Sequence, residues 1–263
     1  MNNKEIPLEK IDSIISLYSI GKAKKAIDEI NLLLNDFPKN PMLLNIQGAC
    51  YAGLYKFDSA IESYEAALKI KPDYADSYYN LGNIYRTLNQ TEKSILNYEK
   101  AVETLPNYVE AIFNLGVSLE DIGRLDDAAE RYEEAIIVKP DFIEARINLG
   151  NIFQTHCDFD QAIEQYQSVL NLDPNNEEVL NNMGNIFRDI DQIEKAIHYY
   201  DRAIESNPKY AASQYNLGLI YQDLGQISKA IIQFENSIKI DENSWSHHNL
   251  SYLKNYKPND PQI

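Results

Sequence analysis

The sequence predicts an all-α protein built as an α-solenoid, a stack of similar helical units that pack on their neighbours. Six prolines recur at every thirty-fourth position, at Pro38, Pro72, Pro106, Pro140, Pro174 and Pro208. Six glycines keep the same step in a second register, at Gly48, Gly82, Gly116, Gly150, Gly184 and Gly218. Apolar residues recur at helical spacing, and no useful stretch alternates with the period of two that strands need. A fixed period of this length indicates a repeat protein.

Seven units of this length, counted from Pro7, fill the middle of the chain after a tail at 1–6. The units are 7–40, 41–74, 75–108, 109–142, 143–176, 177–210 and 211–244. In the third unit, apolar spacing predicts a first helix over 75–85 and a second over 94–101. Proline ends each second helix because it cannot donate to the helical ladder. The residue after four of the prolines is predicted to cap the next helix, at Asp73, Asn107, Asp141 and Asn175.

The turn between the two helices of a unit calls for a residue that tolerates a left-handed backbone. Four units place such residues there, at Gly21, Asn89, Gly123 and Gly225. The other three units have Tyr55, Cys157 and Asp191, which tolerate that backbone less well.

The two ends depart from the pattern, as terminal repeats do when one face meets water. Ile14 stands where the first unit should have its glycine, and Glu242 where the seventh should have its proline. Residues 245–252 look like the start of an eighth unit with one residue deleted. We therefore predict a capping helix over 245–256, covering the seventh unit with Trp245, Leu250, Tyr252 and Leu253, and a tail at 257–263.

The repeat resembles the tetratricopeptide repeat, over about nine-tenths of the chain. The resemblance rests on the pairs Leu81-Gly82, Leu115-Gly116, Leu149-Gly150, Met183-Gly184 and Leu217-Gly218. It also rests on the second-helix aromatics Tyr64, Tyr98, Tyr132, Tyr166, Tyr200 and Phe234. The resemblance implies a right-handed superhelix of helix–turn–helix units, about fifteen helices with the cap, whose concave face binds proteins or peptides.

Composition excludes several partners. With 40 acidic and 24 basic residues the chain carries a formal charge of −16, and it lacks the basic patch that nucleic acid requires. The acidic surface favours neutral or basic partners. The start has no apolar signal core and no 18-residue apolar run exists, so we expect a cytoplasmic protein with no membrane contact. Cys50 and Cys157 lie in different units, and no disulfide is expected.

We find no pattern of catalytic residues, no metal site and no cofactor site. His156-Cys157 is at most half of a metal site, and His247 and His248 point about 100° apart on a helix. Acidic doublets such as Asp126-Asp127 are typical of solvated helix faces. The sequence therefore predicts a protein that is not an enzyme.

The first helix of each unit carries a polar stripe, which the resemblance places on the concave face. Counting from the first residue of a unit, position 6 is asparagine in five consecutive units: Asn80, Asn114, Asn148, Asn182 and Asn216. Position 9 adds Asn83, Asn151 and Asn185, and position 5 adds the aromatics Tyr79, Phe113 and Tyr215, expected to be exposed. An amide offers a donor and an acceptor, which suits the backbone of an extended peptide.

This arrangement is similar to the asparagine ladder of O-linked N-acetylglucosamine transferases. The alternative is that asparagine here is only a feature of the repeat, copied as near-identical units multiplied. Position 2 is acidic in four units, at Asp76, Glu110, Glu144 and Glu178, while Arg86 and Arg188 at position 12 interrupt the acidity. The clamp that holds acidic chaperone C-terminal tails is excluded, because position 5 has no Lys and position 6 no Arg in units two to seven.

Two functions remain open. The chain is a non-catalytic interaction scaffold that binds an extended peptide or a partner helix in its concave groove, or it is the substrate-recognition arm of a larger transferase whose catalytic domain is absent from this chain. For the second, residues 250–263 look like the junction to a sulfotransferase domain in tetratricopeptide–sulfotransferase fusions, and the asparagines look like those of the glycosyltransferases.

Overall fold

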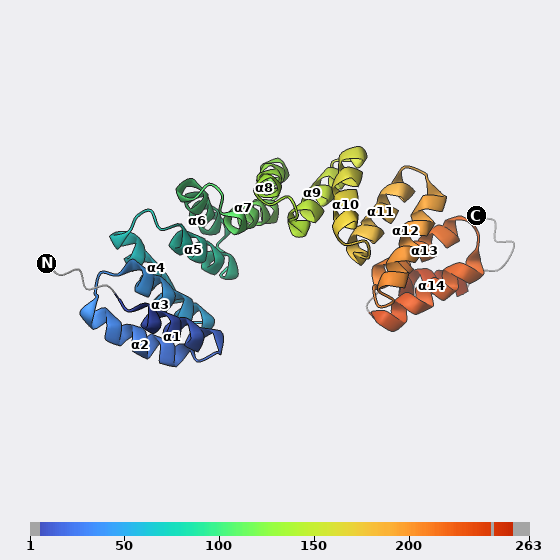
Figure 1. Ribbon diagram of the computed structural model, residues 1–263. Helices are drawn as coiled ribbons and strands as arrows, with labels where there is room; N and C mark the ends of the chain where they lie inside the picture. Colours follow the sequence, from blue (N-terminus) through green and yellow to red (C-terminus); the bar gives the residue numbers. More distant parts are fainter. Residues whose placement is uncertain (1–5, 243–244, 255–263) are drawn as a thin grey trace. The chain divides into compact units, whose positions relative to one another are not determined.

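The computed structural model describes residues 6–242 and 245–254. Over these residues the chain forms fifteen α-helices and no strand, so the predicted all-α fold is confirmed (Figure 1). The helices are α1 Leu8–Ser19, α2 Ala23–Asp36, α3 Pro41–Gly53, α4 Phe57–Ile70, α5 Ala75–Thr87, α6 Thr91–Thr104, α7 Val109–Asp121, α8 Leu125–Val138, α9 Ile143–Thr155, α10 Phe159–Leu172, α11 Glu177–Asp189, α12 Ile193–Ser206, α13 Ala211–Asp223, α14 Ile227–Ile240 and α15 Ser246–Lys254. None is long and apolar enough to cross a bilayer.

The helices form two compact halves, one ending at Pro140 and the other beginning at Asp141. In each half a helix packs mainly on the helices before and after it in the chain. First helices of neighbouring repeats also touch, as α3 does with α5 and α11 with α13. This neighbour-to-neighbour packing is the arrangement of a solenoid.

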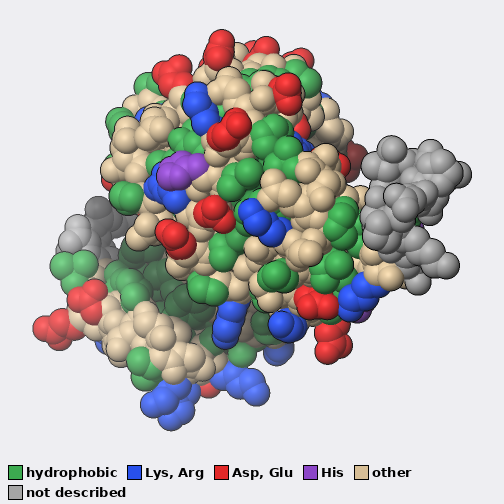
Figure 2. Space-filling model, turned by 90° about the vertical axis from the view of Figure 1, so that its right-hand side faces the viewer, with side chains coloured by type: hydrophobic (Ala, Val, Ile, Leu, Met, Phe, Trp, Pro, Cys, Tyr) green, Lys and Arg blue, Asp and Glu red, His purple; other side chains and the backbone are tan. Residues whose placement is uncertain are grey.

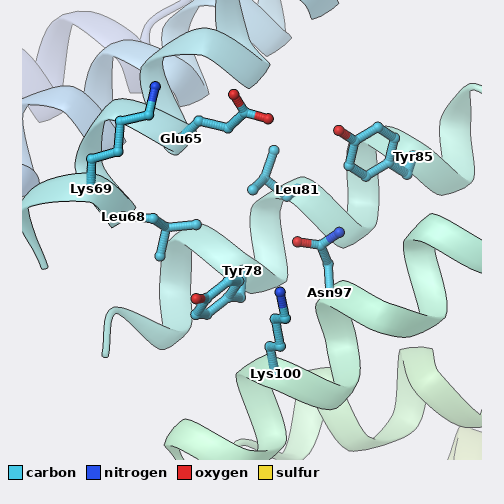
Figure 3. Close-up of a pocket in the computed structure, with 8 residues that line it drawn as sticks. All are labelled: Glu65, Leu68, Lys69, Tyr78, Leu81, Tyr85, Asn97 and Lys100. Atoms are coloured by element: carbon cyan, nitrogen blue, oxygen red, sulfur yellow. The ribbon is translucent and has the colours of Figure 1, made fainter. Parts of the chain in front are cut away.

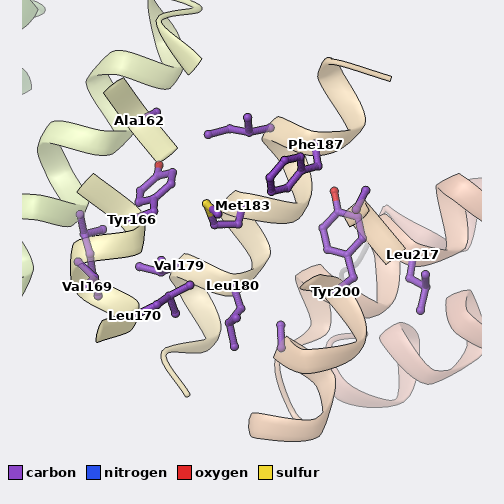
Figure 4. Close-up of a cluster of buried hydrophobic side chains, with 14 of the residues drawn as sticks. Ala162, Tyr166, Val169, Leu170, Val179, Leu180, Met183, Phe187, Tyr200 and Leu217 are labelled. Atoms are coloured by element: carbon purple, nitrogen blue, oxygen red, sulfur yellow. The ribbon is translucent and has the colours of Figure 1, made fainter. Parts of the chain in front are cut away.

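Each repeat from the second to the seventh closes around one glycine and one aromatic ring. A Cβ atom added to Gly150 would lie 2.5 Å from the ring of Tyr166, so only glycine lets the first helix approach the second this closely. The six second-helix aromatics are at most 2% exposed. Figure 4 shows Tyr166 and Tyr200 on either side of α11, with Met183 and Phe187 between them. The glycines therefore recur with the period of the repeat because each one lies at the closest contact between the two helices of its repeat.

The turn inside every repeat has a left-handed residue, whatever its type. Gly21, Gly123 and Gly225 have φ of 75°, 78° and 68°. The other four turns have Tyr55, Asn89, Cys157 and Asp191, with φ between 55° and 62°. The repeat geometry thus imposes this backbone even on residues that do not favour it.

The predicted helix caps are wrong by one residue. Asp73, Asn107 and Asp141 lie within a two-residue turn after the proline, and the helices begin after Tyr74, Tyr108 and Phe142, whose side chains make no capping bond. Asparagine caps only two first helices: Asn40 accepts from the Leu43 N–H at 3.0 Å and Asn176 from the Val179 N–H at 3.1 Å. The aromatic after the turn takes the cap position; Tyr108, for example, packs on Tyr79 with ring centroids 4.9 Å apart.

The last helix, α15, occupies the place of an eighth first helix. Leu253 is 3% exposed and, with Leu250, packs on Phe234. Lys254 Nζ lies 2.9 Å from the Glu235 carboxylate of α14. The expected contribution of Trp245 and Tyr252 is wrong, because they are 79% and 53% exposed. Residues 255–256 of the predicted helix and the tail at 257–263 lie outside the described residues.

Candidate functional site

The eight predicted asparagines all lie on first helices, and all are half-buried. We call this set the asparagine face: Asn80 and Asn83 on α5, Asn114 on α7, Asn148 and Asn151 on α9, Asn182 and Asn185 on α11, and Asn216 on α13. Their amides do not simply project into solvent. They bond to one another and to buried tyrosines, and this bonding determines which of their atoms remain available to a ligand.

In the first half of the chain, Asn83 is the centre of such a group. Its Oδ1 accepts from the Tyr98 hydroxyl at 2.6 Å and from Asn114 Nδ2 at 3.3 Å. Asn114 belongs to the next repeat, and its Nδ2 also lies 3.3 Å from the Tyr79 hydroxyl. One position-9 oxygen therefore joins the two helices of its own repeat to the first helix of the following one.

The second half repeats this bonding twice. Asn151 Oδ1 accepts from the Tyr166 hydroxyl at 2.6 Å and from Asn182 Nδ2 at 3.0 Å. Asn185 Oδ1 accepts from the Tyr200 hydroxyl at 2.8 Å and from Asn216 Nδ2 at 3.1 Å. In each case position 9 accepts and position 6 of the next repeat donates.

The hydrogen-bond partner of the second-helix tyrosine depends on the residue at position 9 of the same repeat. In the fourth repeat position 9 is Val117, and the Tyr132 hydroxyl bonds to Glu120 at 2.6 Å instead. In the seventh, Leu219 stands at position 9 and the ring is Phe234, which has no hydroxyl. Burial raises the pKa of Tyr98 to about 12 and raises the pKa of Tyr166 and Tyr200 as well. These hydroxyls therefore remain protonated donors across the physiological pH range.

Two further asparagines belong to the network and were missed from the sequence. Asn45 and Asn181 occupy position 5 in their repeats. Asn45 Oδ1 accepts from Ser77 at 2.9 Å, and Asn181 Oδ1 accepts from Ser213 at 3.1 Å. A signal for them exists in the sequence: position 3 of the next repeat is serine after these asparagines, but alanine or valine after Tyr79, Phe113 and Ile147.

The network leaves a regular set of atoms uncommitted. Position 6 uses its Nδ2, so the Oδ1 atoms of Asn80, Asn114, Asn182 and Asn216 accept no bond from the described residues. Position 9 uses its Oδ1, so the Nδ2 atoms of Asn83, Asn151 and Asn185 donate to none of the described side chains or backbone groups. None of these seven atoms is an enclosed atom without a partner, so all reach solvent.

The position-5 aromatics are half-buried, where the sequence predicted exposure. Tyr79, Phe113 and Tyr215 each pack on the second-helix aromatic of their own repeat, with ring centroids 5.6–5.9 Å apart. One side of each ring is thus used by the fold.

Charge around the asparagine face is mixed. Asp76, Glu110, Glu144 and Glu178 at position 2 are all exposed. Arg86 lies 3.5 Å from Asp121, and Arg188 pairs with Asp189 at 3.0 Å. Asn83, Arg86, Thr87, Asn89, Tyr98 and Asp121 line a polar pocket of about 480 Å³. Figure 2 shows acidic, basic and apolar side chains intermingled on the side that it presents.

A second pocket, of about 400 Å³, lies among α4, α5 and α6 (Figure 3). Its lining residues are Glu65, Leu68, Lys69, Tyr78, Leu81, Tyr85, Asn97 and Lys100. Tyr78 and Tyr85 stand about 200° around α5 from Asn80 and Asn83, at 100° per residue. This pocket is therefore on the opposite side of the first helix from the asparagine face.

No group of three His, Cys, Asp or Glu side chains that could hold a metal gathers in residues 6–242 and 245–254. Both cysteines are free thiols. Burial raises the pKa of Cys50 to about 11, which makes it an inert thiol at neutral pH.

Models of the tetratricopeptide repeat match the chain at residues 56–88, 75–108, 158–187, 184–225 and 211–244, together more than half of its length. A probable UDP-N-acetylglucosamine–peptide N-acetylglucosaminyltransferase, SEC, of Arabidopsis thaliana is 33% identical over 70 residues. The match covers 27% of this chain and only 7% of the plant protein.

Solved structures share the fold. The C-terminal part of a TPR repeat-containing protein from Cytophaga hutchinsonii superposes with a TM-score of 0.75 at 19% identity, covering 90% of this chain and 98% of that one. YrrB, described as a TPR protein with an unusual peptide-binding site, gives 0.64 at 20% identity and covers 70% and 95%. PilF of Pseudomonas aeruginosa gives 0.66 at 20% identity and covers 81% and 96%.

Proposed function

The chain belongs to the tetratricopeptide-repeat family, and from this premise we propose that it is an interaction scaffold whose asparagine face binds an extended peptide. One observation carries the proposal. From the third repeat to the seventh, each repeat leaves an acceptor at position 6, a donor at position 9 or both uncommitted, fixed in place by the bonds of the other end of the amide. The third and sixth repeats leave both, the fourth and seventh leave the acceptor, and the fifth leaves the donor. A peptide group presents the complementary donor and acceptor at each residue.

The chemistry favours recognition of the main chain over side chains. Preformed amides lose little conformational freedom when a ligand binds, which strengthens binding. The half-buried aromatics at position 5 offer apolar edges beside the amides. The exposed acids at position 2 favour a partner that is neutral or basic along its length.

A binding experiment separates this role from a purely structural one. Peptides selected against the purified protein by display would be titrated against the triple variant Asn114→Ala, Asn148→Ala and Asn182→Ala. We expect a large loss of affinity with a thermal midpoint near that of the wild type. The matched control makes the same change on second helices, at Asn97, Asn171 and Asn236, and should leave binding intact. Equal affinity in both triple variants would refute the proposal.

A change in the ligand tests main-chain recognition directly. Replacing single peptide bonds of a bound peptide with esters removes one N–H donor and weakens the carbonyl acceptor. We expect affinity to fall at several successive positions, while replacement of side chains at those positions has smaller effects. Ester replacement without effect, combined with strong side-chain dependence, would show that the amides of the asparagine face do not hold the backbone.

A second candidate is supported by the plant glycosyltransferase match: the chain acts as the substrate-recognition arm of such an enzyme. The sulfotransferase junction predicted at 250–263 gains no support, and its last nine residues lie outside the described part of the chain. Mass spectrometry of the native protein would test the candidate by showing whether the polypeptide extends into a transferase domain.

A further inference from the structure

The seventh repeat contains buried polar atoms that nothing in the described chain satisfies. Three enclosed side-chain oxygens lack a hydrogen-bond donor within residues 6–242 and 245–254: Oε1 of Gln214, Gln222 and Gln233. All three belong to α13 and α14. Gln214 is 7% exposed, and its Oε1 has been removed from water without a partner among the described residues. Such atoms are rare in native proteins, and each calls for a donor.

An earlier repeat shows what fills this place. Gln214 and Gln233 stand two repeat periods after Arg146 and Gln165. In that repeat the Arg146 guanidinium donates from Nη1 to Gln165 Oε1 at 2.9 Å. The seventh repeat keeps the acceptor as Gln233 but has Gln214 in place of the arginine. It therefore lacks the guanidinium and leaves two acceptors where the fifth repeat has a donor and an acceptor.

Repeat spacing places two carboxylates on the same side of the seventh repeat as these acceptors. By the same repeat spacing, Asp201 and Glu205 of α12 stand where Glu65 and Lys69 line the pocket of Figure 3, and Tyr221 stands where Tyr85 does. Burial and the nearby Asp201 carboxylate both raise the pKa of Tyr221. Neither Asp201 nor Glu205 forms an ion pair within the described residues. We call Asp201, Glu205, Gln214, Tyr221 and Gln233 the outer seam of α12–α14.

The basic groups near the outer seam have other contacts. Lys229 Nζ lies 5.0 Å from the centroid of the Tyr221 ring. Arg202 donates to the Pro174 carbonyl at 3.0 Å. His198 packs edge-on against Tyr199 and also lies near Asp201, where burial and the Glu205 carboxylate raise the pKa of Asp201 more than His198 lowers it. The seam thus combines two negative charges with two unpaired acceptors, whereas the pocket of Figure 3 has Lys69 and Lys100.

We propose that the outer seam binds the guanidinium group of an arginine on a partner protein. The guanidinium supplies the donors that Gln214 and Gln233 lack, and Asp201 and Glu205 balance its charge. Both oxygens are enclosed, so the two glutamine side chains must turn to meet it, and Gln233, a half-buried residue, provides the side from which it enters. The seam lies on the opposite side of the first helix from the asparagine face, so this contact is separate from peptide binding and gives the scaffold a second partner surface.

A pair of small probes tests the proposal on the intact chain. N-acetyl-arginine amide and N-acetyl-citrulline amide have nearly the same shape, but only the first is charged. Each would be titrated against protein labelled with ¹⁵N, following the side-chain amides of Gln214 and Gln233. We expect the arginine probe to shift the signals of both side-chain amides in a saturable way. The citrulline probe should bind at least about tenfold more weakly, since hydrogen bonds to charged groups are roughly twice as strong as those between neutral groups. The backbone signals of Tyr78 and Tyr85, beside the two lysines, should not move.

The variant Gln214→Arg copies the fifth repeat and supplies the guanidinium from within. It should raise the stability of α13–α14 and abolish the shift of Gln233 caused by the arginine probe. The double variant Asp201→Asn with Glu205→Gln should lower the affinity for the arginine probe while the fold is retained. The proposal is overturned if both probes act equally, if neither shifts the two glutamines, or if Gln214→Arg binds the arginine probe as the wild type does. Those results would mean that water alone satisfies the two oxygens.

Discussion

The two asparagine positions should respond differently to alanine, and Asn185→Ala is the sharpest case. Its Oδ1 is the only acceptor that the described residues give the Tyr200 hydroxyl, on a side chain that is 0% exposed. Leaving a buried hydroxyl without an acceptor costs about 1–3 kcal/mol. Alanine recovers roughly 0.5 kcal/mol of helix propensity. Asn216 keeps a second acceptor in Asn181 at 3.0 Å. The expected net loss of stability is therefore about 0.5–2.5 kcal/mol, the cost of the unpaired hydroxyl less the gain in propensity.

Asn182→Ala is the matched control on the same helix. It removes one donated bond to Asn151 at 3.0 Å, worth about 1 kcal/mol. Asn151 still accepts from the Tyr166 hydroxyl, and alanine again gains roughly 0.5 kcal/mol. The stability should therefore change little, and this difference lets position 6 be mutated for binding studies without loss of the fold.

The assay must resolve single repeats, because stability in a solenoid is a sum of repeat and interface terms. Hydrogen–deuterium exchange of the amides of α11 and α12 reports the local opening free energy. In a double-mutant cycle, Asn185→Ala should cost less than about 0.5 kcal/mol once Tyr200 is phenylalanine. If Asn185→Ala is neutral, or costs the same with and without the Tyr200 hydroxyl, the bond is not a stabilising one and the division of roles fails.

Three further predictions follow from the same structure. Phe234→Tyr should stabilise α13–α14 by about 1–2 kcal/mol, because the new hydroxyl would donate to the unsatisfied Gln222 Oε1. The Tyr166 hydroxyl makes the equivalent bond to Gln154 Oε1 at 3.1 Å, and unchanged hydrogen-exchange protection of α13–α14 would contradict the prediction. Cys157→Gly, at φ 62°, should raise stability by up to about 1 kcal/mol in a urea melt, and Asn89→Gly by less, since asparagine tolerates that backbone better. Between about pH 10 and 12 an unfolded tyrosine ionises while Tyr98, with its pKa raised by burial to about 12, keeps its proton. Tyr98 alone should therefore lower stability by about 1.4 kcal/mol per pH unit there, buried Tyr166 and Tyr200 should add to this slope, and Tyr98→Phe should lessen it; a flat alkaline profile would speak against the prediction.

The sequence predicted those features that the repeat itself imposes. Period and glycine register indicated helix pairs, and the structure has the left-handed turn even at Cys157 and Asp191. The cap predictions were wrong because Asp73 belongs to a two-residue turn with Pro72, so that Tyr74 takes the cap position of α5, and no periodicity reveals the length of such a turn. The prediction for Trp245 was wrong for a related reason. Spacing assigns a residue to a helix face, but near a chain end the spacing does not show whether a neighbouring helix covers that face.

A helical wheel placed the asparagines on one face correctly but treated each as an isolated side chain. The information about their partners was present in the comparison of repeats with one another. Position 9 is asparagine in three of the five repeats that have a second-helix tyrosine, and there the tyrosine donates to it. It is leucine where that ring is Phe234, and alanine or valine in the two remaining repeats, those of Tyr64 and Tyr132. Such paired changes favour a structural role for one end of each amide, and they also explain how that role and ligand binding coexist. An amide has two ends, and the bond that holds one end in the fold fixes the direction of the other end in each repeat that has the asparagine.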